Sequence, residues 1–173
     1  MHLPPETRRL RFRPLVPADA AALADVFNDD YAKQFYGEMS LELAEKWVRK
    51  NEKRYLDDGS GLWALELLDT GEFIGDCGLA YQDVDSVREL EIGYHIHRDH
   101  RRKGFASEAA KACFEYGFAN MDIERLISLV DKTNVASEGV ASRLYNERSE
   151  TVRANRPHWV YFTRREDWLK AQR

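Results

Sequence analysis

The most constraining feature of the sequence is a strand, a basic turn, a helix and a second strand in direct succession. Residues 89–96 (ELEIGYHI) have the pattern of a strand, and the turn at 97–104 holds six residues that can carry positive charge and one glycine. A helical pattern of apolar and small residues runs from Ala106 to about Phe118. Residues 125–131 (RLISLVD) are typical of a strand buried on both faces. Because a helix between two strands lets them run in the same direction, this order predicts a parallel strand pair.

The rest of the chain predicts further strands and helices without a linker between them. Three of the strand segments are separated only by turns, which indicates an antiparallel meander. The expected elements are strands at 8–15, 62–68, 73–81 and 89–96, helices at 17–27 and 40–56, a loop with a short helix at 134–147, and a final strand at 158–169 that runs into a polar turn. Pro14 places the first strand near a sheet edge. The pattern predicts a mixed α+β fold with a mostly antiparallel sheet flanked by helices.

Composition limits the class of protein. The 173 residues, of which 43% are hydrophobic, suffice for one domain over residues 1–173. The spacing of the two cysteines suits no metal site, so Cys77 and Cys113 are expected as reduced thiols in the core. No segment approaches the roughly 18 apolar residues of a membrane span, and the start has no apolar leader, so we expect a soluble cytoplasmic protein without a membrane partner. A net charge of -4 argues against a nucleic-acid partner, so an anion site must be local.

The basic turn predicts a site for a diphosphate. A helix N-terminus exposes backbone N–H groups, and Gly104 can adopt the positive φ that lets a ligand approach the backbone. Arg101, Arg102 and Lys103 would raise the local potential. The chain lacks the glycine patterns of dinucleotide-binding loops and of nucleotide triphosphatases, which argues against both classes. A solvated basic turn is the alternative.

The pattern Arg101-x-x-Gly104-x-Ala106 between a strand and a helix resembles motif A of the GNAT superfamily of acetyl-CoA-dependent N-acetyltransferases. The segment NVASEGVA at 134–141 is similar to one in the RimJ/RimL-type branch of ribosomal-protein acetyltransferases, and other segments agree in order and spacing over nearly the whole chain. The resemblance implies the GNAT fold, whose sheet splays at its central strands, and acetyl-CoA as cosubstrate without a metal. The residues expected at the coenzyme are Ile96, His97, Arg101, Arg102, Lys103, Gly104, Phe105, Ala106, Ser107 and Asn134.

The resemblance also implies roles in acetyl transfer from a thioester to an amine. Glu91 aligns, with a one-residue gap, with the glutamate base of histone-type GNAT enzymes, and burial would raise its pKa toward the working pH. His95 lies on the same strand face and could relay a proton through water. Gly93 between them suggests a β-bulge or a close backbone approach. Ser137 is the expected proton donor to the departing sulfur. The alternatives are a surface charge for Glu91, a packing role for His95 and a helix cap for Ser137.

Two positions depart from the family pattern. Ala141 stands where many GNAT enzymes carry a tyrosine acid, and Tyr145 with Asn146 replaces the residues that begin the next strand. We therefore expect a weakened strand over the polar residues 147–159, and Tyr145 could enter the cleft as the acid. A coenzyme A-binding sensor without turnover is the alternative function. A nucleic-acid-binding domain without a coenzyme is a third.

The acceptor amine is the least defined feature. A peptide N-terminal α-amine is slightly favoured by its lower pKa, and a small-molecule amine remains open. In the loop at 28–40, Asp29, Asp30 and Glu38 could attract a cationic acceptor. The residues expected to contact the acceptor are Tyr36, Trp63, Tyr94 and His95, with core burial as the alternative for Tyr36 and Trp63. Trp47 lies on the apolar side of the helix at 40–56 and is expected in the core. The resemblance also allows a homodimer.

Overall fold

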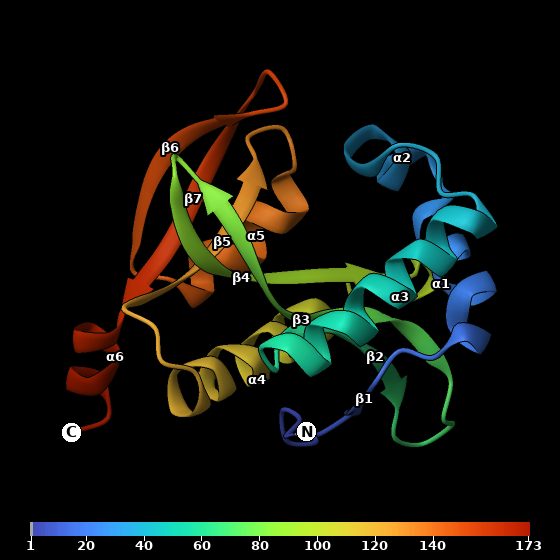
Figure 1. The fold of residues 1–173 in the computed structure, drawn as a ribbon, viewed down its shortest axis with the longest axis horizontal. Coiled ribbons are helices and arrows are strands. Elements are labelled where there is room, and N and C mark those ends of the chain that lie inside the picture. Colours follow the sequence, from blue (N-terminus) through green and yellow to red (C-terminus); the bar gives the residue numbers. More distant parts are fainter. Residues whose placement is uncertain (1) are drawn as a thin grey trace.

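Seven strands form one twisted sheet in the order β1-β2-β3-β4-β5-β7-β6, with helices packed on both of its faces (Figure 1). The computed structural model describes residues 2–173. The strands are β1 (Leu10–Arg13), β2 (Gly61–Leu67), β3 (Phe73–Val84), β4 (Val87–Ile96), β5 (Arg125–Asp131), β6 (Glu147–Arg153) and β7 (Arg156–Arg164). The helices are α1 (Ala20–Phe27), α2 (Asp30–Tyr36), α3 (Leu41–Asp57), α4 (Phe105–Asn120), α5 (Val135–Leu144) and α6 (Arg165–Ala171), with short 3₁₀ helices at Pro17–Asp19 and Arg98–His100. The mixed α/β class with a mostly antiparallel sheet is confirmed.

Successive side chains of a strand point to opposite faces of the sheet, so the hydrophobic core is divided between the two faces. Trp63 and Leu65 of β2 belong to the cluster that packs against α4, while Ala64 between them belongs to the cluster of α1 and α3. This alternation is the normal consequence of strand geometry. None of the helices among residues 2–173 combines the length and the apolar character that crossing a membrane would require.

The parallel pair predicted from the strand–turn–helix–strand order is β4 with β5. Only two register pairs join them, Leu90 with Leu126 and Glu91 with Ile127. In contrast, β4 pairs with β3 along its whole length, up to Ile96 opposite Gly75. The sheet therefore splays after Glu91, and one edge of β4 loses its strand partner over its last five residues, 92–96.

Of the two expectations for Gly93, a β-bulge or a close backbone approach, the structure excludes the β-bulge. Gly93 pairs in unbroken register with Gly78 of β3. A Cβ atom at Gly93 would lie 3.5 Å from Cδ2 of Leu62, an ordinary contact. The splay comes instead from β5, which turns away from a regular β4.

The sequence pattern missed α2, which lies in the segment expected to be a loop. Its N-cap is Asp29, whose side chain accepts hydrogen bonds from the N–H groups of Tyr31 and Ala32. The chain leaves the helix at Gly37, with a φ of 75°. The helix has seven residues, too few for a clear apolar period.

The polar C-terminal segment forms a full hairpin, which corrects the expected weak strand. β6 pairs with β7 from Glu147 to Arg153 and is the outermost strand of the sheet, so polar side chains can face solvent. Ala154 and Asn155 make the turn with φ values of 47° and 60°. The predicted C-terminal polar turn is the short helix α6.

Candidate active site

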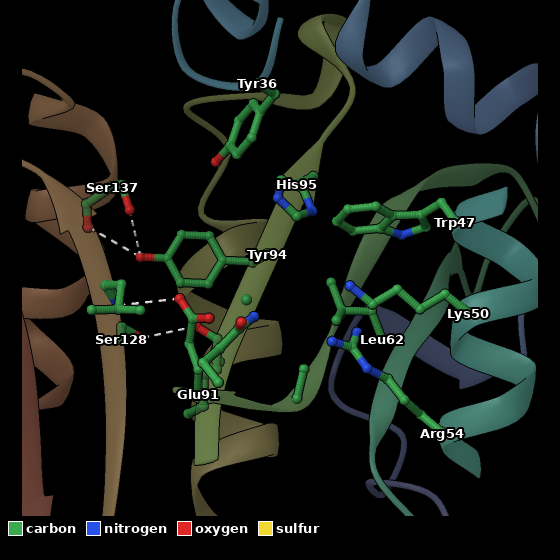
Figure 2. Close-up of a pocket in the computed structure, with 15 residues that line it drawn as sticks. Tyr36, Trp47, Lys50, Arg54, Leu62, Glu91, Tyr94, His95, Ser128 and Ser137 are labelled. Atoms are coloured by element: carbon green, nitrogen blue, oxygen red, sulfur yellow. Dashed lines mark hydrogen bonds between the residues drawn. The ribbon is translucent and has the colours of Figure 1, made fainter. Parts of the chain in front are cut away.

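The splay between β4 and β5 opens a cavity of about 210 Å³ on the face of the sheet covered by α3 (Figure 2). Residues of α2, α3, α5 and strands β2 to β5 line it: Tyr36, Trp47, Lys50, Arg54, Leu62, Ala80, Gln82, Glu91, Ile92, Gly93, Tyr94, His95, Ser128, Leu129 and Ser137. A second cavity of about 370 Å³ reaches the β6–β7 hairpin and shares Tyr36, Glu91 and Ser137 with the first. The residues named for acid–base chemistry thus come together in one place.

Glu91 is a half-buried carboxylate at the point where the two strands part. Burial raises the pKa of Glu91, while a hydrogen bond from the Leu129 N–H, at 3.3 Å from Oε1, and the charge of Arg153 oppose the shift. A carboxyl group with a raised pKa is suited to accept a proton near neutral pH. The alternative of a solvated surface charge is not what the structure shows.

His95 also faces the cavity and is held by a carboxylate that the sequence did not single out. Its Nδ1 lies 2.6 Å from Oδ1 of Asp76, whose other oxygen accepts the Trp47 indole N–H at 2.9 Å. The imidazole sits among the rings of Phe27, Tyr36 and Trp47, with centroids 4.7, 4.8 and 5.6 Å away. Among the described residues, Nε2 has no hydrogen-bond partner, so this nitrogen is available to a ligand. A tertiary contact creates the pair, since Asp76 is on β3 and His95 on β4.

Hydroxyl groups from two elements meet on the β5 side of the cavity. The Tyr94 hydroxyl lies 3.0 Å from Ser137 Oγ and 3.1 Å from the Ser137 carbonyl oxygen (Figure 2). Burial raises the pKa of Tyr94, which keeps the phenol protonated. The cap of α5 is Asn134, whose Oδ1 accepts from the Ser137 N–H at 3.0 Å and from the Tyr31 hydroxyl at 2.6 Å. Ser137 is therefore not the capping residue, and its hydroxyl is directed toward Tyr94.

The turn before α4 has the backbone that a diphosphate site requires. Gly104 adopts the left-handed conformation, with a φ of 84°, directly before the first helical turn. In the described chain, the N–H groups of Phe105, Ala106 and Ser107 have no hydrogen-bond acceptor. Arg9 fixes the turn from outside: it forms an ion pair with Glu108 at 2.7 Å and donates to the Lys103 carbonyl at 2.9 Å.

Comparison with known proteins identifies the family. The model of the acetyltransferase (GNAT) domain matches residues 9–144. The chain belongs to the GNAT acetyltransferase family. It is therefore an acetyl-CoA-dependent acetyltransferase.

Relatives of this acetyltransferase cover nearly its whole length. It is 36% identical over 158 residues to the uncharacterized protein YkkB of Bacillus subtilis, covering 90% of this chain and 92% of that protein. The crystal structure of an acetyltransferase from Agrobacterium tumefaciens has a TM-score of 0.79 at 26% identity and covers 94% of this chain and 95% of that one. RimL, a ribosomal α-N-protein acetyltransferase in complex with coenzyme A, has a TM-score of 0.73 at 17% identity over 94% of this chain and 98% of that one, which shows a common fold.

Four basic side chains of the turn pair with carboxylates, and for His97 and Arg101 this corrects the expectation that they face the coenzyme. Arg98 pairs with Asp25 at 3.2 Å. The Arg101 guanidinium pairs with Asp29 at 2.6 Å and donates to the Ile96 carbonyl at 2.9 Å, so it holds α2 against β4. His97 Nε2 lies 3.0 Å from Asp25, and His100 Nε2 lies 3.0 Å from Glu72. The Ile96 side chain is buried in the core. Only the side chains of Arg102 and Lys103 are exposed and without an ion pair in the described part of this turn.

Three aromatic expectations for this acetyltransferase were wrong. Trp63 has no exposed surface and stacks on Tyr55 in the core, whereas Trp47, which the helical pattern placed among core aromatics, lines the cavity. Tyr145 is buried, with its hydroxyl 2.8 Å from the Ile127 carbonyl and 3.0 Å from Ser128 Oγ, so it does not enter the cleft as an acid. Tyr36 does line both cavities, as expected.

The acidic residues expected to attract a cationic acceptor lie elsewhere. Asp29 caps α2 and pairs with Arg101, which lowers the pKa of Asp29 to about 2. Asp30 is exposed in the first turn of α2, and the Glu38 side chain is 83% exposed. None of the three lines either cavity. The charged side chains that line the first cavity from α3 are the cations of Lys50 and Arg54 (Figure 2).

Proposed function

We propose that this acetyltransferase transfers the acetyl group of acetyl-CoA to a primary amine by direct attack of the amine on the thioester. The observation that carries the proposal is the position of Glu91, a half-buried carboxylate facing a cavity at the point where β4 and β5 separate. In the reaction a C–N bond forms, the C–S bond breaks, the amine loses a proton and the sulfur gains one. The side chains of the cavity account for both proton transfers.

Glu91 is the base, either directly or through water. Burial raises the pKa of Glu91, so the carboxylate is basic enough at neutral pH to accept the ammonium proton. His95, with Nδ1 held by Asp76, offers Nε2 to the same cavity and relays the proton. No covalent enzyme intermediate is needed, since an unprotonated amine attacks a thioester directly.

Ser137 supplies the proton to the departing sulfur. Its Oγ lies 3.0 Å from the Tyr94 hydroxyl, and that phenol stays protonated because burial raises the pKa of Tyr94. The two hydroxyl groups can therefore pass a proton between them. This pair takes the role of the tyrosine acid that many GNAT enzymes carry at the position of Ala141, because the Ala141 side chain is fully buried and has no proton to donate.

Acetyl-CoA supplies the activated acetyl group, and the residues of the turn before α4 fit its diphosphate. The free N–H groups of Phe105, Ala106 and Ser107 and the left-handed Gly104 form the cradle, with Arg102 and Lys103 at its rim. The unpartnered edge of β4 after Glu91 offers backbone groups to the pantetheine amides. Asn134 orders the opposite wall through its cap of α5.

The biological setting is part of the proposal. We propose that the chain resembles the RimJ/RimL branch of the family, a resemblance that rests on residues 134–141. We also propose that residues 1–173 act as one domain. Cys77 and Cys113 are buried free thiols with sulfur atoms 3.6 Å apart, which fits the reducing cytoplasm. We expect neither nucleic acid nor membrane as a partner, and a homodimer is compatible with this site.

The test is release of free thiol from acetyl-CoA with a panel of amines, and calorimetry of coenzyme binding in parallel. Glu91→Gln is expected to lower kcat by roughly 100-fold while coenzyme affinity is retained. Glu45→Gln, on the exposed face of α3, is the matched control and should leave both quantities unchanged. Saturable coenzyme binding without thiol release from any amine would contradict the proposal and favour the sensor. An unchanged rate in Glu91→Gln would contradict the role of Glu91.

A further inference from the structure

The cations of α3 fall into two groups that differ in their partners. Those on its solvent face pair with carboxylates four residues away: Lys46 with Glu42 at 2.7 Å, Arg49 with Glu45 at 3.6 Å, and Lys53 with Asp57. Lys50 and Arg54, which lie one turn apart on the same helix, form no ion pair with any described residue. They are the two α3 cations that line the cavity.

Lys50 has no carboxylate at the helical positions beside it, and the two carboxylates that follow Arg54, Asp57 and Asp58, pair with other cations. The positions four residues before and after Lys50 are Lys46 and Arg54, both cations. The position four residues after Arg54 is Asp58, which pairs with Arg88 at 3.0 Å instead. The single hydrogen bond of the Arg54 guanidinium to a described residue is a long one, 3.4 Å to Asn51 Oδ1.

Leaving these cations together has an electrostatic cost. Burial lowers the pKa of Lys50, and the neighbouring charge of Arg54 lowers it further. Burial also lowers the pKa of Arg54. Like charges at i and i+4 destabilise a helix, so an anion placed between them would be stabilised by both.

Positive charge also outweighs negative charge in the rest of the cleft. Glu91 is the sole carboxylate among the residues lining the first cavity. Arg153, on the far side of Glu91 in the second cavity, forms no ion pair with any described residue, and its charge acts on Glu91. The acidic residue in the second cavity besides Glu91 is Asp131, which pairs with Arg156 at 2.9 Å. The cleft therefore carries more positive than negative charge around its single free carboxylate.

We infer that the acceptor is an amine that also carries an oxyanion, a carboxylate or a phosphate, bound by Lys50 and Arg54. The amine faces Glu91 and His95 on β4, and the oxyanion faces α3, from which both cationic side chains point toward β4 (Figure 2). A polyamine or another polycation would be repelled by this wall. The inference rests on the proposed function and replaces the cationic acceptor expected from Asp29, Asp30 and Glu38.

The experiment compares acceptors in which the group beside the amine is anionic, neutral or cationic. Thiol release is measured with α-amino acids, their α-carboxamides, diamines of equal length and aminoalkyl phosphates. We expect kcat/KM to be at least about tenfold higher for an oxyanion-bearing amine than for its neutral or cationic analogue, as for other hydrogen bonds between charged groups. The carboxylate and phosphate series then show which oxyanion is the better one.

Variants on α3 test the assignment of the site. Lys50→Met and Arg54→Gln should each raise KM for the preferred oxyanion acceptor by roughly tenfold and leave KM for its carboxamide and for acetyl-CoA unchanged. Lys53→Gln, which removes a cation of the same helix from the solvent face, is the matched control and should change none of these. Melting temperatures establish that all three variants are folded.

The possible failures are distinguishable. Turnover that favours the carboxamide or the diamine, or variants that affect charged and neutral acceptors alike, would overturn the inference while the proposed function stands. Coenzyme binding without thiol release from any acceptor would overturn the proposed function and this inference with it.

Discussion

The Nδ1 atom of His95 lies 2.6 Å from Oδ1 of Asp76, a carboxylate without exposed surface. The second oxygen of Asp76 accepts the indole N–H of Trp47 at 2.9 Å. The two contacts fix the plane of the imidazole and leave Nε2 for the cavity. A carboxylate that orients a histidine in this way also selects the tautomer with the proton on Nδ1.

Asp76→Asn should therefore impair catalysis without removing a cavity side chain. The amide can donate to Nδ1, which would place the imidazole proton on Nε2 and spoil the relay. We expect kcat to fall by roughly tenfold or more with unchanged coenzyme affinity. His95→Gln should give the same loss, and Asp76→Asn added to it should cause no further loss. A further loss in the double variant would show that Asp76 does not act through His95.

Glu91→Gln should make the protein more stable at neutral pH while it loses activity. Burial raises the pKa of Glu91 in the folded protein, so the ionised form is disfavoured there. The folded state binds the proton more tightly than the unfolded state, and stability declines as the pH rises through the folded pKa. Urea unfolding should show the variant to be more stable at about pH 8, with the difference shrinking toward about pH 4. A less stable variant at pH 8 would contradict the raised pKa.

Gly104→Ala tests the coenzyme cradle against Gly71→Ala as a matched control. Both glycines have positive φ, 84° and 71°, so either substitution should cost roughly 1–2 kcal/mol of unfolding free energy. Gly71 lies in the β2–β3 turn, whereas Gly104 precedes the free N–H groups of α4. Calorimetry should show weaker coenzyme A binding for Gly104→Ala alone. Equal affinities in the two variants would contradict the cradle.

Arg101→Met should destabilise the protein in a pH-dependent manner. The Arg101 guanidinium, the largest cause, and the N–H groups of Ala32 and Tyr31 together lower the pKa of Asp29 to about 2 from an ordinary value of 3.8. The whole shift corresponds to about 2 kcal/mol of stability above that ordinary value, and Arg101 contributes the largest share of it. This contribution is lost as the pH falls from 3.8 through about 2. Unfolding in urea at descending pH should show the gap between parent and variant closing. Arg102→Met, which removes an exposed cation without an ion pair, should show no gap at any pH.

Local sequence determined the scaffold and the backbone of the coenzyme turn. The strand–turn–helix–strand order predicted the parallel pair of β4 and β5, because each element has its own residue period. The positive φ of Gly104 followed from its place directly before a helix. Glu91 and Ser137 were placed in the cleft by resemblance, and the structure brings both to the same cavity.

Contacts between distant segments decided the rest, because charge in a sequence does not reveal its partner. Arg101 was expected at the phosphate, but Asp29, 72 residues away, takes its guanidinium. Asp76 could not be recognised as a site residue from the sequence, because its partner His95 lies on the next strand. Trp47 was expected in the core and Trp63 at the cavity, and the structure shows the reverse, because helical and strand periods do not show which buried face borders a cavity. Lys50 and Arg54 are ordinary cations of a surface helix in the sequence. Only the packing of α3 against β2 and α1 directs them toward the cavity beside Glu91, where the absence of ion-pair partners among the described residues points to a ligand.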